Sequence, residues 1–258
     1  MAEDEDNYED FDRPQYERPE KIDPNDLRHA LGTLALFDSD TFLGMQAYNL
    51  GAVDQFIMTL EYDVLKELIE SDRTPAASAM FLSAQSQMWI FLAYEILRTW
   101  RQRVRDIQKW ERSGGLKAKL EALSRDRGYL HVGREMRASQ IKQVMENPEL
   151  SGQIETDLRR AHIPFTRLEH LRVSLAKHEV RRKGGSVALR PGYGRINYMC
   201  GALDYELEIG QYSLGTMSRR DVADEIRALA NTEYVPSEAD IASFDEFMRG
   251  PPDDIDRS

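Results

Sequence analysis

The sequence predicts a mainly α fold: a bundle of long antiparallel helices with a small C-terminal β-hairpin or three-stranded addition and a final helix. Apolar residues recur every three or four positions over most of residues 24–183, which is the period of an amphipathic helix. One such pattern continues for nearly 40 residues, a length that suits helices running the whole length of a bundle. A period of two appears near residue 205 and predicts a strand there.

The N-terminal elements follow from caps and spacing. Residues 1–26 hold eleven acidic and three basic residues, and we expect a disordered acidic tail. Asp23 followed by Pro24 is typical of a helix start and predicts a short helix over 24–37. Apolar spacing then predicts either one interrupted helix or two over 40–71, because two glycines inside this pattern permit a break.

The middle of the chain contains the longest pattern. Thr74 and Pro75 repeat the cap and proline, and they open a helix that continues to Gly114 and Gly115. A further helix follows over 116–147, with weak points at its internal glycines, and residues 149–162 are also expected to be helical.

In the C-terminal part of the chain, the spacing of apolar residues changes from the period of a helix to that of a strand. Pro164 opens a predicted helix over 164–183, which a pair of glycines ends. A hairpin is expected over 187–199, and apolar and acidic residues alternate over 203–209 as in a half-buried strand. Ser218 then caps a final helix that reaches residue 229.

Four regions result from this pattern: a disordered tail over 1–26, a helical bundle over 27–183, a hairpin with a helix packed on the bundle over 184–230, and an acidic, largely flexible tail over 231–258. The net charge is −11, of which the two tails carry −8 and −6, so the predicted folded part carries +3. The positive charge of the folded part is compatible with a phosphate-rich partner, and we expect the acidic tails to weaken or regulate the binding of that partner.

Several function classes are excluded by what the sequence lacks. The acidic N-terminal residues leave no apolar region for a signal peptide, and no apolar run approaches the roughly 20 residues of a membrane span. A single cysteine, Cys200, excludes an internal disulfide, and the cytoplasm is the expected compartment. The sequence has neither a glycine-rich phosphate loop nor a metal-binding histidine helix, so we expect no cofactor and no metal.

One short motif points to chemistry. In the segment from Arg172 to Glu179, an arginine, five residues and a histidine lie on one predicted amphipathic helix. This pattern, with the Leu-Ala-x-His-Glu string that ends it, resembles the signature of the HEPN superfamily of helical bundles. A second match to the spacing, from Arg125 to His131, lies beside a helix-weakening glycine and is not favoured. Val173 departs from the polar residue that often follows the arginine in that family.

The resemblance implies a metal-independent endoribonuclease of the kind found in toxin and phage-defence systems. His178 would act as acid or base, Arg172 would stabilise charge on the phosphate, and Glu179 would orient the arginine. The basic side chains near the end of the same helix would bind the RNA backbone: Lys177, Arg181, Arg182 and Lys183.

The spacing between Arg172 and His178 indicates how copies of the chain would assemble. Six positions on an ideal helix separate Arg172 from His178 by about 120°, so one helix presents both poorly to a single phosphate. The resemblance implies a homodimer in which two motif helices meet. RNA is the expected partner, with an antitoxin or regulatory protein as a further candidate. The alternative is a catalytically silent helical interaction or nucleotide-binding module that acts as a dimeric regulator.

Overall fold

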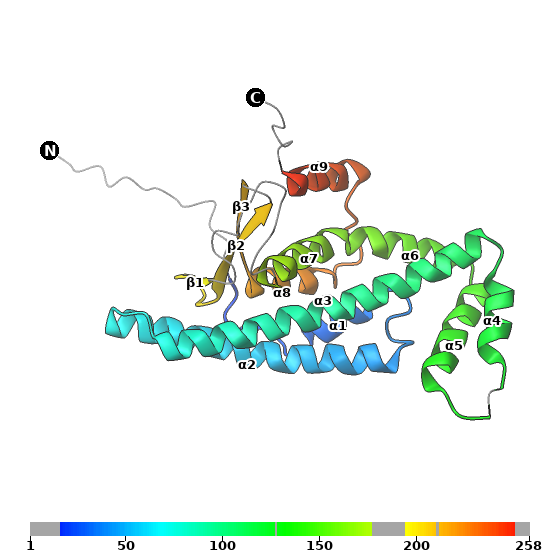
Figure 1. Cartoon of the computed structure of the whole chain (residues 1–258), viewed down its shortest axis with the longest axis horizontal. Helices are drawn as coiled ribbons and strands as arrows, with labels where there is room; N and C mark the ends of the chain where they lie inside the picture. The colour runs from blue at the N-terminus through cyan, green and yellow to red at the C-terminus, as the bar shows by residue number, and fades with distance from the viewer. Residues whose placement is uncertain (1–15, 127, 177–193, 210–211, 251–258) are drawn as a thin grey trace.

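Two long helices form the spine of the protein. In the computed structural model, the described residues are 16–126, 128–176, 194–209 and 212–250. Helix α2 (Thr41–Ser71) and helix α3 (Ala76–Arg112) lie side by side and run antiparallel (Figure 1). The Asp40 side chain accepts hydrogen bonds from two backbone amides of the first turn of α2. Helix α2 is continuous through both of its glycines, so residues 40–71 form one helix.

The first elements cover one side of this spine. A 3-10 turn, η1 (Pro19–Lys21), and helix α1 (Asp26–Gly32) both contact α2. The hydroxyl of Tyr16 donates a hydrogen bond of 2.7 Å to Asp221, so packing begins before the boundary predicted at residue 27. Helix α1 is shorter than the helix predicted over 24–37, because turns follow it and Leu36 adopts a φ of 62°.

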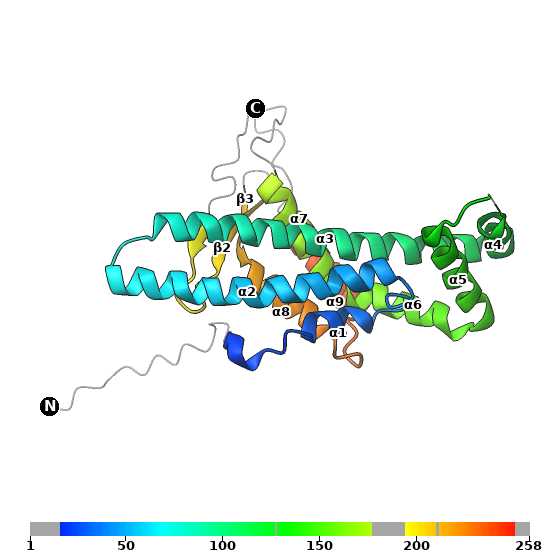
Figure 2. The same ribbon diagram turned by 90° about the horizontal axis from the view of Figure 1, so that it is seen from below.

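A helical hairpin stands at the far end of α3. It consists of α4 (Leu116–Ser124) and α5 (Val132–Glu146), so the single helix predicted over 116–147 is two helices. Helix α6 (Glu149–Arg160) and helix α7 (His162–Ala176) then return along α3 (Figure 2).

A small antiparallel sheet follows, with the strand order β1-β2-β3. It is formed by β1 (Gly194–Ile196), β2 (Leu203–Ile209) and β3 (Tyr212–Ser218). The strand predicted over 203–209 is confirmed, and β3 is a further strand that the sequence pattern did not predict. Of the hairpin expected over 187–199, residues 187–193 lie outside the described residues, and β1 lies in its second half. Gly201 has a φ of 78°, and a Cβ atom there would overlap the backbone of Glu61, so the turn before β2 fits against α2 only with glycine.

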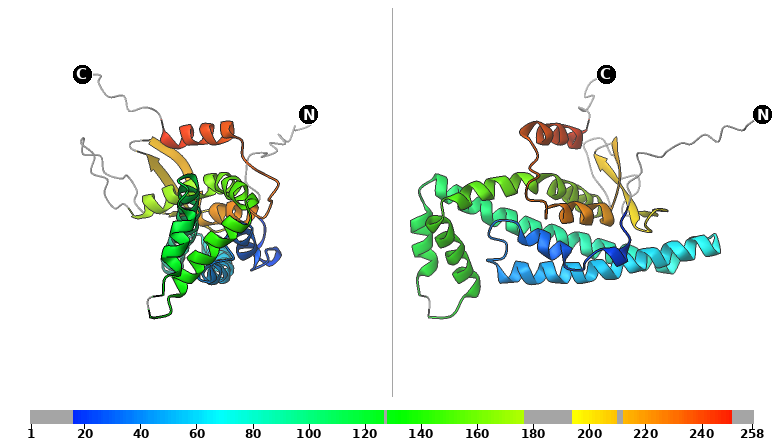
Figure 3. Two further views of the ribbon diagram at one scale, coloured as in Figure 1. Left: turned by 90° about the vertical axis from the view of Figure 1, so that its right-hand side faces the viewer. Right: turned by 180° about the vertical axis from the view of Figure 1, so that it is seen from behind.

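Two helices complete the chain. Helix α8 (Arg219–Ala228) begins at a capping box between Ser218 and Asp221 and packs against α1 and α7. Helix α9 (Glu238–Arg249) lies within the segment predicted as a flexible tail, and it stands on the outer side of α7 (Figure 3). The mainly helical class with a small sheet and a final helix is therefore confirmed.

The core joins these elements into one apolar cluster. The indole N–H of Trp89 donates to the carbonyl of Leu50, and that of Trp100 donates to the carbonyl of Ala35. Cys200 is buried, and burial raises the pKa of its thiol to about 12. Within the described residues, no helix is long and apolar enough to cross a bilayer.

Candidate anion-binding groove

A row of cations follows one side of α3. Its members are separated by steps of three or four residues, which places successive side chains on neighbouring turns of one helix face. Its first and last members are fourteen positions apart, or about 21 Å at the rise of an α-helix. We refer to it as the α3 cationic row: Arg98, Arg101, Arg105, Lys109 and Arg112.

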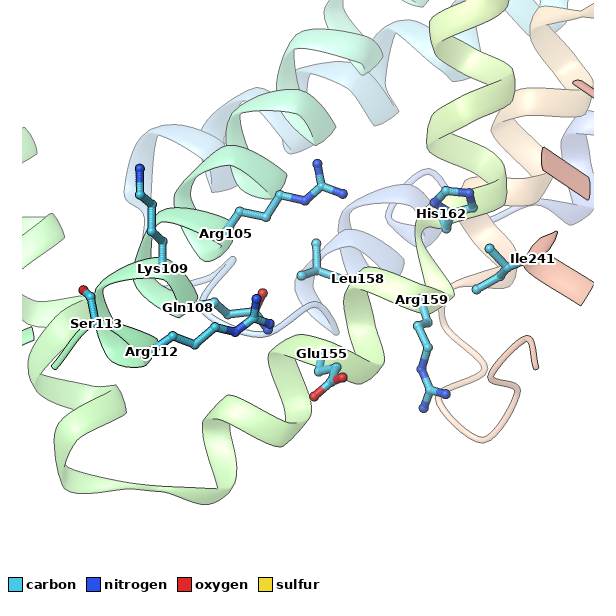
Figure 4. Close-up of a pocket in the computed structure, with 10 residues that line it drawn as sticks. All are labelled: Arg105, Gln108, Lys109, Arg112, Ser113, Glu155, Leu158, Arg159, His162 and Ile241. Atoms are coloured by element: carbon cyan, nitrogen blue, oxygen red, sulfur yellow. The ribbon is translucent and has the colours of Figure 1, made fainter. Parts of the chain in front are cut away.

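The C-terminal half of the row lines a groove of about 770 Å³ between α3, α6, α7 and α9. Figure 4 shows the side chains of Arg105 and Arg112 reaching from α3 toward α6. Arg159 and His162 border the groove from the α6–α7 side, and Glu155 is the one carboxylate among its described lining residues. The groove is therefore lined by a large excess of positive charge.

Most of the cations in this row lack a carboxylate partner. Arg98 forms a salt bridge of 2.6 Å with Glu95, but the remaining four members form no salt bridge within the described part of the chain. Burial lowers the pKa of Arg101, and the neighbouring positive charge of Arg105 lowers it further. The charges of Glu169 and Asp245 oppose this shift. Cations held close together in excess of carboxylates favour the binding of a polyanion.

The predicted catalytic arginine is connected to this row through stacked rings. The guanidinium carbon of Arg172 lies 5.2 Å from the ring centroid of Tyr94 on α3 and 5.9 Å from that of Phe91. Tyr94 stacks on Phe165 with the centroids 5.7 Å apart, and the guanidinium of Arg101 lies 4.3 Å above the Phe165 ring. Arg172 therefore lies on the same side of α3 as the cationic row.

The surroundings of Arg172 are half-buried and polar. Its Nε atom is buried and has no hydrogen-bond partner among the described residues. The Tyr94 hydroxyl donates a hydrogen bond of 3.2 Å to Glu169, and burial together with that carboxylate raises the pKa of the Tyr94 phenol. The ring contacts hold the guanidinium in one place, although part of its hydrogen-bonding capacity is unused.

The rest of the predicted site lies outside the described residues. This applies to both of the other proposed catalytic side chains, since α7 is described only as far as Ala176. It also applies to all of the predicted RNA-binding side chains. The predicted residues concerned are Lys177, His178, Glu179, Arg181, Arg182 and Lys183.

The second match to the motif has a structural role. Arg125 ends α4, and His131 is the N-cap of α5, where its ring nitrogen accepts a hydrogen bond from the amide of Arg134. Both residues lie in the connection between two helices, away from the cationic row on α3 (Figure 1).

Sequence analysis did not single out the residues of the groove. The segment 98–142 holds thirteen basic and five acidic residues, a density that was visible in the sequence. The steps of three and four between the cations of α3 would have placed them on one face. Their grouping with Arg159 and His162 depends on α6 and α7 folding back along α3, which the local sequence does not specify.

Helix α9 lies at the edge of the groove and carries the opposite charge. It holds four acidic residues and one basic residue. The Nε2 atom of His162 lies 2.7 Å from Asp245, and the ring of Phe244 packs between His162 and the guanidinium of Arg167. Ile241 contributes an apolar wall. The groove is thus bordered by an acidic helix that the chain itself supplies.

The described residues contain no cluster of three or more His, Cys, Asp or Glu side chains arranged to hold a metal ion. Comparisons with protein-family models, with curated proteins and with solved structures found no match.

Proposed function

We propose that the protein binds RNA along the α3 cationic row and cleaves it beside Arg172, as a metal-independent endoribonuclease of the HEPN type. The observation that carries the proposal is the stacked series from Arg172 through Tyr94 and Phe165 to Arg101. It puts the motif arginine close to Arg101, a member of the row that forms no salt bridge with the described residues. An RNA strand bound to the row would pass this arginine.

The chemistry uses side chains of this chain alone. His178 removes the proton of the 2′-hydroxyl, or protonates the leaving 5′ oxygen, because imidazole titrates near neutral pH. The guanidinium of Arg172 donates hydrogen bonds to the phosphate oxygens, on which negative charge builds up. Glu179 orients the arginine, and the basic residues from Lys177 to Lys183 hold the backbone.

The test is cleavage of RNA by the purified full-length protein in EDTA. We expect wild type to release RNA fragments, and His178→Ala to lower the rate by a factor of about 100 or more. The matched control is His131→Ala, which alters the histidine of the second Arg-x5-His match and should cleave like wild type. Equal rates for wild type and His178→Ala would contradict the catalytic assignment.

A catalytically silent module is the second candidate, favoured by the contacts that already engage the Arg172 guanidinium with two aromatic rings. Such a protein would bind RNA or a nucleotide in the groove without cleaving it, and would act through a partner protein such as an antitoxin. Intact RNA in the EDTA assay, together with RNA binding that the groove residues control, would favour this module.

The acidic border leads to a separate prediction. Asp245→Asn removes the carboxylate that pairs with His162, so we expect RNA affinity at low salt to rise by about two- to fivefold. Fluorescence anisotropy with a labelled single-stranded RNA measures the change. Glu246→Gln removes the same charge from α9 without touching a described partner, and it should change affinity less. Identical effects of the two variants would mean that only the net charge of α9 matters.

A further inference from the structure

The outer face of α2 has the composition of a protein interface. Asp54 is the one charged residue of the helix between residues 41 and 60, and it is buried. The solvent-facing positions of this segment carry no charged side chain. Charged residues make up 31% of the whole chain. Five large apolar side chains on this face are between 37% and 63% exposed: Phe42, Met45, Tyr48, Val53 and Phe56.

Four of these residues are arranged symmetrically about Asn49. Phe42 precedes it by seven positions and Phe56 follows it by seven, while Met45 and Val53 lie four positions before and after it. The steps of three, four, four and three place these four residues and Asn49 along one face of the helix. A helix face with this symmetry is complementary to itself when a second copy runs in the opposite direction.

We propose that two copies of this chain associate through α2, packed antiparallel about a two-fold axis at Asn49. In that arrangement Phe42 faces the Phe56 position of the partner, and Met45 faces the Val53 position. The two Asn49 amides meet on the axis, where each can donate to the other and thereby set the register.

The available area fits a dimer of modest affinity. Three half-exposed aromatic side chains and two aliphatic ones offer roughly 400–500 Å² of apolar surface per copy. A standard interface buries about 800 Å² per partner. Uncharged residues beside the apolar row supply further area without the cost of burying a charge: Thr41, Gln46, Ala52 and Thr59.

This interface does not depend on the proposed function. Helix α2 lies on the side of the bundle opposite α7 and α9, so the dimer leaves both cationic grooves facing outward (Figures 1 and 3). It differs from a dimer in which two motif helices meet.

A charge exchange tests both the surface and the antiparallel register. Sedimentation or light scattering of the full chain should give a dimer for wild type and a monomer for Met45→Lys and for Val53→Glu, because each variant places an unpaired charge opposite an apolar side chain. The double variant carries both changes and should recover the dimer, since Lys at 45 then faces Glu at 53 of the partner. A parallel pair would bring like charges together instead.

Thermal unfolding followed by circular dichroism should show that the single variants remain folded. Three results would overturn the proposal: a monomeric wild type at every concentration, a dimer that both single variants preserve, or a double variant that stays monomeric.

Crosslinking provides a second measurement. Asn49→Cys should form an intermolecular disulfide on mild oxidation, because the two positions meet on the axis. Lys66→Cys is the matched control on the same helix: it lies seventeen residues further along, about 25 Å from the axis, and should stay uncrosslinked. The native Cys200 is buried and does not interfere. Equal crosslinking of the two variants would count against the interface.

Discussion

Replacement of Arg219 by methionine is expected to lower the free energy of unfolding by about 3–5 kcal/mol. Arg219 is fully buried, and its Nε and Nη2 atoms donate hydrogen bonds of 2.9 and 2.7 Å to one carboxylate oxygen of Glu61. It also pairs with Asp54, which Arg227 contacts in turn. Without Arg219, the buried Glu61 carboxylate has lost its described cationic partner, and an uncompensated buried charge is costly.

Urea denaturation measures this loss, and two further variants identify its cause. Arg98→Met removes an exposed arginine whose partner Glu95 remains solvated, so the stability of this variant should stay close to that of wild type. Adding Glu61→Leu to Arg219→Met removes the stranded carboxylate and should restore much of the stability. A loss below about 1 kcal/mol for Arg219→Met alone would show that water reaches Glu61.

The same network has a pH dependence of known sign. Burial raises the pKa of Glu61, and the hydrogen bonds and charge of Arg219 oppose that rise. In Arg219→Met the hydrogen bonds and charge of Arg219 are lost, so burial and the charge of Asp54 raise the pKa of Glu61 against Arg220 alone, and folding favours the protonated carboxyl. A carboxyl whose pKa is raised on folding loses stability as the pH rises above its unfolded pKa. The deficit of the variant should therefore be smaller near pH 5 than near pH 8.

Simultaneous replacement of Arg105, Lys109 and Arg112 by glutamine is expected to weaken RNA binding by about a hundredfold at low salt. All three side chains line the groove, and none forms a salt bridge within the described residues. Each phosphate contact on a single strand contributes about 0.7 to the slope of log affinity against log salt concentration, so the slope should fall by about 2. Anisotropy titrations at several salt concentrations measure both quantities.

A control variant with the same change in net charge distinguishes binding in the groove from attraction to the whole protein surface. Lys66, Arg73 and Lys142 are exposed cations outside the groove, and their replacement by glutamine should leave both affinity and salt slope nearly unchanged. Equal losses in the two triple variants would indicate diffuse attraction to the whole protein and would contradict binding in the groove.

Local sequence patterns were sufficient for much of the fold. Caps and the apolar period located α2, α3, α7 and β2, because each of these elements buries one stripe or face along its own length. Helix α9 was missed in a segment dominated by acidic residues and prolines. Its start nevertheless has a readable signal, since Ser237 and Asp240 form a capping box.

The sequence by itself determined the class of fold, the order of the main helices and the concentration of positive charge around residues 98–142 and 158–195. Only the tertiary structure decided which charges are buried and which are exposed. Arg219 lies three positions before Val222 on the buried face of α8, where it meets Asp54 and Glu61 of α2 in the core. Arg105 and Arg112 form no salt bridge with the described residues, and they line a groove. Apolar periodicity reports burial along one helix, whereas the pairing of charges depends on which distant helices become neighbours.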